Sequence, residues 1–141
     1  MRFRDSAELS RVIGFSPWSL TNRQSPTRSQ IHTCVVFARY NSTLSTLDLR
    51  GNNLGDEGCG SLAASLQIVN ETLTSLDLGY NEIKDEGAYM LASAIKGNGG
   101  GVLNEIKLNN NYITKFGEVA LTEAAELVQE MNEGKELEVY F

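Results

Sequence analysis

The chain has 141 residues, of which 41% are hydrophobic and 21% are charged, and this composition fits one folded globular domain rather than a disordered tail. Its formal net charge is −6, and the charge is uneven, because residues 1–40 contain six arginines against Asp5 and Glu8. The strongly acidic remainder argues against nucleic-acid binding, and no apolar run approaches the roughly 20 residues of a membrane-spanning helix.

Residues 1–30 are predicted to be an irregular or degenerate N-terminal segment. They are rich in serine and arginine, which is weakly similar to an organelle transit peptide, but they lack the apolar stretch of a secretory signal. We therefore expect a cytoplasmic protein. Phe15-x-x-Trp18-x-Leu20 repeats a spacing found later in the chain, and residues 31–40 then fit the helix of a worn first repeat. The alternative is that residues 1–30 are largely disordered.

From residue 44 onward, one pattern occurs three times. Its second copy begins 29 residues after the first, and its third copy begins 30 residues after the second. Agreement in both spacing and residue type predicts a stack of similar units, with repeats of about 44–72, 73–102 and 103–132. The three copies read Leu44-x-x-Leu47-x-Leu49-x-x-Asn52-x-Leu54, Leu73-x-x-Leu76-x-Leu78-x-x-Asn81-x-Ile83 and Leu103-x-x-Ile106-x-Leu108-x-x-Asn111-x-Ile113.

Each repeat is expected to hold a short strand followed by a helix. Leu47 and Leu49 alternate with polar residues, so one face of the strand is buried and the other is exposed. From Gly58 onward the apolar residues, such as Leu62 and Leu66, have helical spacing. The residues expected to act as N-caps of the three helices are Asp56, Asp85 and Thr114.

The asparagines Asn52, Asn81 and Asn111 are interpreted as structural rather than catalytic. Each follows a strand, where its side-chain amide can bond turn backbone groups that have no strand partner, forming a buried ladder along the stack. One unit cannot bury its own leucines. The gain of roughly 1.5–3 kcal/mol per buried leucine therefore depends on a neighbouring repeat.

The C-terminal residues are expected to complete the stack. Residues 137–141 alternate between apolar and other side chains in a way that suits a closing strand. The acidic residues between Glu123 and Glu138 fit the solvated side of a terminal helix. The glycine run at 97–101 precedes a strand and lacks the Lys-Ser/Thr pair of a phosphate-binding loop, so it is interpreted as a return loop.

Residues 47–58 and 76–87, which read LDLRGNNLGDEG and LDLGYNEIKDEG, resemble leucine-rich repeats of the ribonuclease-inhibitor-like type. That family includes the sensor ends of NACHT-type immune receptors, tropomodulin-like actin caps and the activator of the Ran GTPase. The resemblance implies an α/β fold over residues 31–141: a right-handed solenoid with parallel strands on the concave face and α-helices on the convex face. The third copy departs from the pattern at residues 114–116.

The resemblance also implies that a partner binds the strand face, so the outward strand residues are the candidate binding residues. Parallel strands lie about 4.8 Å apart, and Asp48 and Asp77 are therefore expected to be stacked neighbours. This pair suits a basic group or a metal ion, but metal sites need more ligands, and two hydrated charges are the simpler interpretation. The candidate partner-binding residues are Thr46, Asp48, Arg50, Ser75, Asp77, Tyr80, Glu105, Lys107 and Asn109.

We expect a non-catalytic scaffold that binds another protein, without a cofactor or a metal. His32 has no fixed partners for a catalytic triad, and Cys34 and Cys59 fit small buried residues. About nine outward residues fall short of the 20–30 per side of a stable interface, which favours weak binding, and self-association through the end strands is also open. Two alternatives stay open: a GTPase-activating protein of the Ran-activator type, and a fragment of a larger repeat receptor without independent activity.

Overall fold

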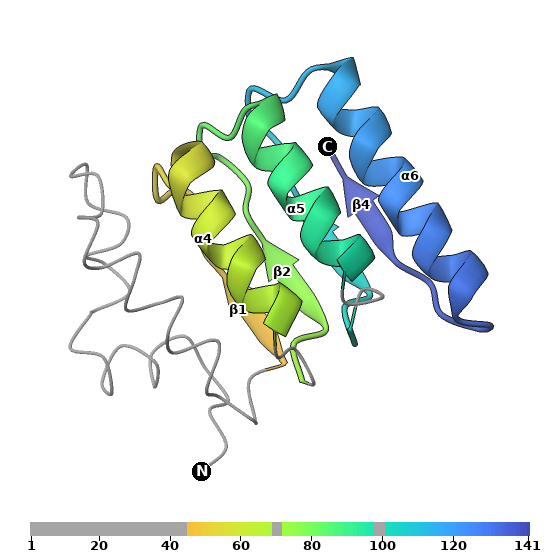
Figure 1. Cartoon of the computed structure of the whole chain (residues 1–141). Coiled ribbons are helices and arrows are strands. Elements are labelled where there is room, and N and C mark those ends of the chain that lie inside the picture. The colour runs from red at the N-terminus through yellow and green to blue at the C-terminus, as the bar shows by residue number, and fades with distance from the viewer. Residues whose placement is uncertain (1–44, 69–71, 98–100) are drawn as a thin grey trace, which may run out of the picture.

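The computed structural model describes residues 45–68, 72–97 and 101–141 (Figure 1). Strands and helices alternate along this part of the chain, as the repeats predict. The interpretations of residues 1–40 and of the middle of the glycine run lie outside the described residues. The elements are β1 (Thr46–Asp48), α4 (Gly55–Ile68), β2 (Ser75–Asp77), α5 (Asp85–Gly97), β3 (Glu105–Lys107), α6 (Lys115–Met131) and β4 (Glu138–Tyr140).

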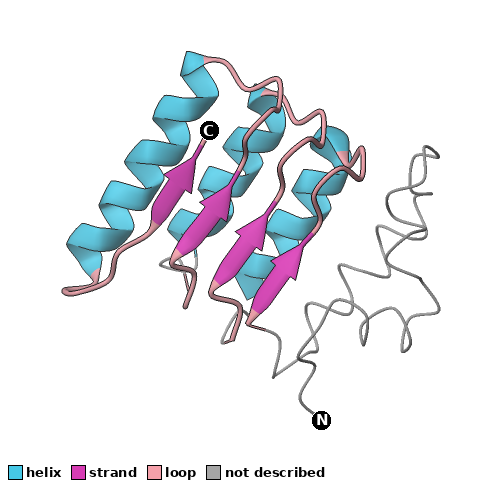
Figure 2. Ribbon diagram, turned by 180° about the vertical axis from the view of Figure 1, so that it is seen from behind, coloured by secondary structure: helices cyan, strands magenta, loops and turns pink. Residues whose placement is uncertain are grey.

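The four strands form one parallel sheet in the order β1-β2-β3-β4. Its register aligns Leu47, Leu76 and Ile106 in one row, which continues to Val139 in β4. The three helices lie side by side over one face of the sheet, and the view from behind shows the strands on the other face (Figures 1 and 2). This two-layer arrangement confirms the predicted α/β repeat fold, and β4 confirms the predicted closing strand.

The hydrophobic core lies between the sheet and the helices. Strand residues such as Leu76 and Ile106 are fully buried, and so are the helix residues Leu91 and Leu121. These side chains come from different repeats but belong to one continuous cluster. Each is worth roughly 1.5–3 kcal/mol when it is buried, and a single repeat offers no neighbour to bury it.

The predicted asparagine ladder is present. The Asn81 Oδ1 atom accepts hydrogen bonds from the backbone N–H of Asn52 at 2.9 Å and of Leu54 at 3.3 Å. The Asn111 Oδ1 atom accepts in the same way from Asn81 and Ile83, both at 3.0 Å. Each oxygen thus satisfies two turn amides of the preceding repeat, which confirms that these asparagines connect neighbouring repeats.

The aspartates expected to be N-caps act differently. Asp56 lies inside α4 and Asp85 is the first residue of α5, so neither precedes its own helix and that prediction was wrong. Instead, Asp56 Oδ1 accepts hydrogen bonds from the N–H groups of Lys84 at 2.8 Å and Gly87 at 2.9 Å, at the start of the next helix. Stacking places successive helix starts side by side, so each aspartate satisfies amides of the following repeat.

The third helix start follows the same rule and adds a cap of its own. Asp85 Oδ1 accepts from the Thr114 N–H at 2.7 Å, and its Oδ2 accepts from the Thr114 hydroxyl at 2.7 Å. Thr114 is also the N-cap of α6, because its Oγ1 accepts from the Phe116 N–H at 3.3 Å, as predicted.

Close approach between repeats explains one repeated glycine. A Cβ atom at Gly87 would lie 2.6 Å from Asp56 Oδ1 and 2.8 Å from Ile83 Cγ2. A Cβ at Gly117 would lie 2.6 Å from both Asp85 Oδ1 and Ile113 Cγ2. The position therefore has no room for a side chain, because the preceding aspartate reaches over it to the helix start.

Cys59 is fully buried in α4, which confirms the interpretation of this cysteine, whereas Cys34 lies outside the described residues. Its S–H donates to the Gly87 carbonyl over 3.5 Å. Burial, with a smaller effect of the Asp56 charge, raises the pKa of the thiol to about 12. The group is therefore a packed, protonated thiol in the native protein.

Candidate functional site

The outward residues of the four strands form two rows across the sheet. The register confirms the predicted stacking of Asp48 beside Asp77. We call the surface made by these rows, together with Arg50, Tyr80 and Asn109 at its margin, the strand face. The first row is Thr46, Ser75, Glu105 and Glu138, and the second row is Asp48, Asp77, Lys107 and Tyr140.

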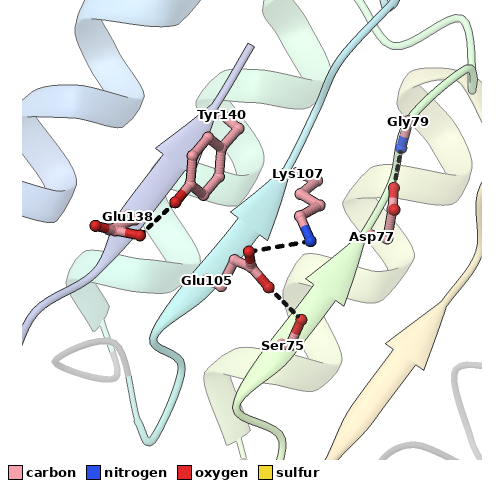
Figure 3. Close-up of polar contacts among 7 residues, drawn as sticks. All are labelled: Ser75, Asp77, Gly79, Glu105, Lys107, Glu138 and Tyr140. Atoms are coloured by element: carbon pink, nitrogen blue, oxygen red, sulfur yellow. Dashed lines mark hydrogen bonds and ion pairs between the residues drawn. The ribbon is translucent and has the colours of Figure 1, made fainter.

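A polar network fixes the middle of the strand face. The Ser75 hydroxyl donates to Glu105 Oε2 at 2.8 Å, and the Lys107 ammonium lies 3.0 Å from Glu105 Oε1 (Figure 3). The hydrogen bond from Ser75, followed by the contact with Lys107, holds the pKa of Glu105 below its ordinary value. Glu105 is therefore ionised and oriented by residues from two strands at neutral pH.

The stacked aspartates have a local structural role. Asp48 Oδ1 accepts from the Arg50 N–H and Asp77 Oδ1 accepts from the Gly79 N–H, both at 2.9 Å. Each carboxylate thereby satisfies the backbone amide two residues later, where the strand ends. Within the described ranges, no group of three or more histidine, cysteine, aspartate or glutamate side chains is placed to hold a metal ion. The charges of the pair remain available to a basic partner group.

Tyr80 has an unusual backbone for an aromatic residue. Its φ of +56° is left-handed, as are those of Gly51 (+71°) and Asn110 (+57°) at the same position of the first and third repeats. This conformation costs roughly 1–2 kcal/mol for a residue with a side chain. The Tyr80 side chain is 49% exposed, and the Arg50 guanidinium carbon lies 4.9 Å from its ring centroid. A strained, exposed Tyr–Arg pair thus borders the strand face.

The C-terminal strand adds residues that the sequence analysis did not assign to the site. Glu138 and Tyr140 continue the two rows, and the Tyr140 hydroxyl donates to Glu138 Oε2 (Figure 3). This hydrogen bond, first among several causes, raises the pKa of Tyr140. The alternation at residues 137–141 was the available signal, because a closing strand necessarily presents its outward residues on the same face.

The structure brings the nine candidate residues together along one surface. Asn109, at its margin, donates from Nδ2 to the Phe141 carbonyl at 2.8 Å and so ties the turn after β3 to the end of the chain. The role of these residues in partner binding stays a proposal. The charged groups of the strand face are the carboxylates of Asp48, Asp77, Glu105 and Glu138 and the cations of Arg50 and Lys107. The surface therefore has more negative than positive groups.

In the ranges that the structure covers, no helix combines the length and the apolar character needed to cross a membrane.

Comparison with known proteins identifies the repeats. Residues 40–63 and 69–92 each match the family described as "Leucine Rich repeat". No curated protein matches the chain. Among solved structures, the chain is similar to "Leiomodin-1 Actin-Binding Site 2 (ABS2)", with a TM-score of 0.68 and 21% sequence identity over 100% of this chain and 82% of that chain. The structural likeness supports the fold, and the described residues form a short leucine-rich-repeat solenoid.

Proposed function

We propose that this leucine-rich-repeat protein is a non-catalytic module that binds another protein through its strand face. The observation that carries the proposal is the strained and exposed Tyr80, paired with Arg50 beside a surface of ordered carboxylates. The repeat fixes the left-handed backbone at this position, because Gly51 and Asn110 share it, and glycine and asparagine adopt it more readily than tyrosine. The Tyr80 ring is 49% exposed, so packing in the core does not account for a tyrosine here. Tyrosine and arginine are also the residues that most often dominate protein interfaces.

The chemistry of the strand face defines the kind of partner. Four carboxylates against two cations favour a partner segment with lysine or arginine side chains. Glu105 is already held by Ser75 and Lys107, so binding costs little side-chain entropy there. Tyr80, in the turn after β2, and Tyr140, in β4, are 49% and 42% exposed and offer aromatic contacts to a partner.

Repeats of 29 and 30 residues with full α-helices support the ribonuclease-inhibitor-like subtype. Actin is the first partner to test, because the similar solved structure is titled an actin-binding site. The surface is smaller than the 20–30 residues per side of a standard interface, so we expect weak binding unless the turns contribute. On the described strand face, no specific observation favours GTPase activation.

The test uses variants that remove charge and keep the local hydrogen bonds. Asp48→Asn/Asp77→Asn preserves the oxygen that accepts from each turn amide and removes two negative charges from the strand face. Glu123→Gln/Glu126→Gln is the matched control, because it removes two exposed carboxylates from α6 in the helix layer. Circular dichroism and thermal melting establish that both variants are folded.

Binding is measured with purified monomeric actin and by affinity capture followed by mass spectrometry. We expect proteins captured by the wild type to be retained by the α6 control and reduced several-fold with Asp48→Asn/Asp77→Asn. Capture should also weaken as salt is raised, since the partner is basic. Identical capture by all three proteins would rule out recognition by the strand face. The titration with actin decides separately whether actin is the partner.

A further inference from the structure

The asparagine ladder is incomplete at its first described step. Asn81 Oδ1 and Asn111 Oδ1 each accept two backbone N–H groups from the preceding repeat. Asn52 is only 4% exposed. Among the buried side-chain oxygen and nitrogen atoms of the described residues, its Oδ1 is the one without a hydrogen bond. A buried amide oxygen without a donor costs about 1–3 kcal/mol, so this site is chemically set to receive two N–H groups.

The edge of β1 beside Asn52 has matching carbonyl groups. Along the sheet, outward residues accept from the preceding strand: the Leu49 N–H donates to the Asp77 carbonyl and the Gly51 N–H to the Gly79 carbonyl, both at 2.9 Å. Asp48, at the end of β1, and Arg50, two residues after it, occupy the corresponding positions one repeat earlier. No described strand lies beyond β1, so this edge is open to pairing with one more strand.

We propose that residues 15–44 of the same chain form a further repeat that docks on this edge. With the 29-residue offset, the Leu20 and Asn22 N–H groups donate to the Asp48 and Arg50 carbonyls. The offset also assigns the two donors to the Asn52 oxygen: the N–H groups of Arg23 and Ser25 occupy the positions of Asn52 and Leu54. The docked strand extends each of the two rows of the strand face by one outward residue.

Both prolines of the chain fit this register. Pro17 falls at the position of Thr46 and Ser75, where the N–H points back to the preceding strand, as the Ser75 N–H does to the Ser45 carbonyl at 3.1 Å. A first strand has no preceding strand, so proline is tolerated there. Pro26 falls at the position of Gly55 and Lys84. Proline cannot adopt the φ of +58° that Gly55 has, so residue 26 follows Lys84, which is not left-handed and whose N–H donates to an aspartate of the preceding repeat.

Three further observations favour this occupant over a separate molecule. The 44 residues before Ser45 are longer than one 29-residue repeat, so the segment can reach the edge while covalently attached to it. Trp18 and Leu20 match the inward positions of Leu47 and Leu49 and supply the apolar side chains that a new layer needs. Residues 1–40 also have an excess of positive charge beside an acidic remainder.

The test is hydrogen exchange of single backbone amides in the full chain, followed by nuclear magnetic resonance. We expect the Leu20, Arg23 and Ser25 amides to exchange about 100-fold or more slowly than in an unfolded chain, while the Ser19 amide, on the outer edge, exchanges fast. The Asp48 amide becomes slow as well, because it then donates to the Trp18 carbonyl. Uniformly fast exchange at residues 15–25 would overturn the proposal, and so would protection without this alternation.

A pair of variants separates docking from other sources of protection. Leu20→Asp places a charge at an inward position and should abolish protection at Arg23, Ser25 and Asp48. Ser19→Asp adds the same charge at an outward position of the same strand and should leave protection unchanged. Equal effects of the two substitutions contradict the proposed register. Protection that disappears on dilution would contradict docking within one molecule and would instead indicate a second copy of the chain at the β1 edge.

Discussion

Residues of the strand face differ in whether they stabilise the fold. Glu105, Asp48 and Asp77 accept hydrogen bonds from their own surroundings, so they contribute locally whether or not a partner is bound. Tyr80 is the opposite case, because its backbone is unfavourable and its ring is half exposed. The alternation of the strand predicted which residues face outward, but it contained no information on hydrogen bonds between residues of different repeats.

Tyr80 provides a test in which stability and binding move in opposite directions. We predict that Tyr80→Gly raises the free energy of unfolding by up to about 1 kcal/mol, because glycine adopts a φ of +56° freely. The same substitution should weaken capture of the partner, since it removes the aromatic contact and the Arg50 stacking. Urea denaturation and affinity capture measure the two effects. Lower stability together with unchanged binding would show that the ring serves the fold.

The buried thiol of Cys59 gives a second residue-scale prediction. With a pKa of about 12, only about one thiol in ten thousand is ionised at pH 8. In a Cys34→Ser background, the remaining cysteine should react with a colorimetric thiol reagent many-fold more slowly in native buffer than in denaturant. Fast modification under native conditions would contradict the packing of α4 against the start of α5.

At the scale of elements, neighbouring helices depend on each other through the aspartates that reach from one helix start to the next. Sequence reasoning identified the correct residue type and the correct end of the helix but assigned Asp56 and Asp85 to their own helices. The reason is physical: an N-cap rule describes one helix in isolation, whereas stacking brings a second set of unpaired amides within reach. Thr114 obeyed the rule because it precedes α6.

The contact between Asp85 and Thr114 predicts a specific response to acid. The Thr114 hydroxyl, followed by its backbone N–H, lowers the pKa of Asp85 in the folded state. Asp85 therefore stabilises the fold above the ordinary aspartate pKa of about 3.9, and this contribution is lost as pH falls through the lower, folded-state pKa. We predict that lowering the pH from 7 to 3 reduces the melting temperature of Asp85→Asn by less than that of the wild type. A Glu123→Gln control, which leaves this contact intact, should follow the wild type.

Gly87, near the start of α5, predicts that a larger residue at this position destabilises the fold. Gly87→Ala should lower the free energy of unfolding by about 1–3 kcal/mol, because its Cβ would lie 2.6 Å from Asp56 Oδ1 and 2.8 Å from Ile83 Cγ2. Gly60→Ala in α4 is the matched comparison. Its Cβ would meet only the Met90 side chain, which is flexible, and alanine favours the helix by up to about 1 kcal/mol. Equal losses in urea denaturation would contradict the tight contact between repeats.

For the whole molecule, stability comes from contact between successive repeats. The sequence predicted this architecture because spacing and residue type recur in register, and the row from Leu47 to Val139 confirms it. The sequence did not reveal that Glu138 and Tyr140 belong to the candidate site. The C-terminal strand lacks the full motif, so only the register of the folded sheet assigns its outward residues to the two rows.

Cooperation among repeats predicts the effect of removing a central side chain. Leu76→Ala should lower the free energy of unfolding by about 2–5 kcal/mol, since Leu76 is fully buried between two neighbouring strands. Val119→Ala, at a position 54% exposed on α6, should change it by less than about 0.5 kcal/mol. Far-ultraviolet circular dichroism and tyrosine fluorescence should report the same midpoint in urea. Separate midpoints would mean that the repeats unfold independently.

The offset between each aspartate and the helix that it serves gives the chain a direction. The second unit is both recipient and supplier: its helix start uses the carboxylate of Asp56, and it offers Asp85 to its successor. If residues 73–102 were duplicated directly after the original, every helix start would still have an aspartate of the preceding repeat to accept its N–H groups. A duplicate of the third unit would present Lys115 where an acid is required. Lengthening this protein by gene duplication or by engineering is therefore straightforward from the middle and obstructed at the end.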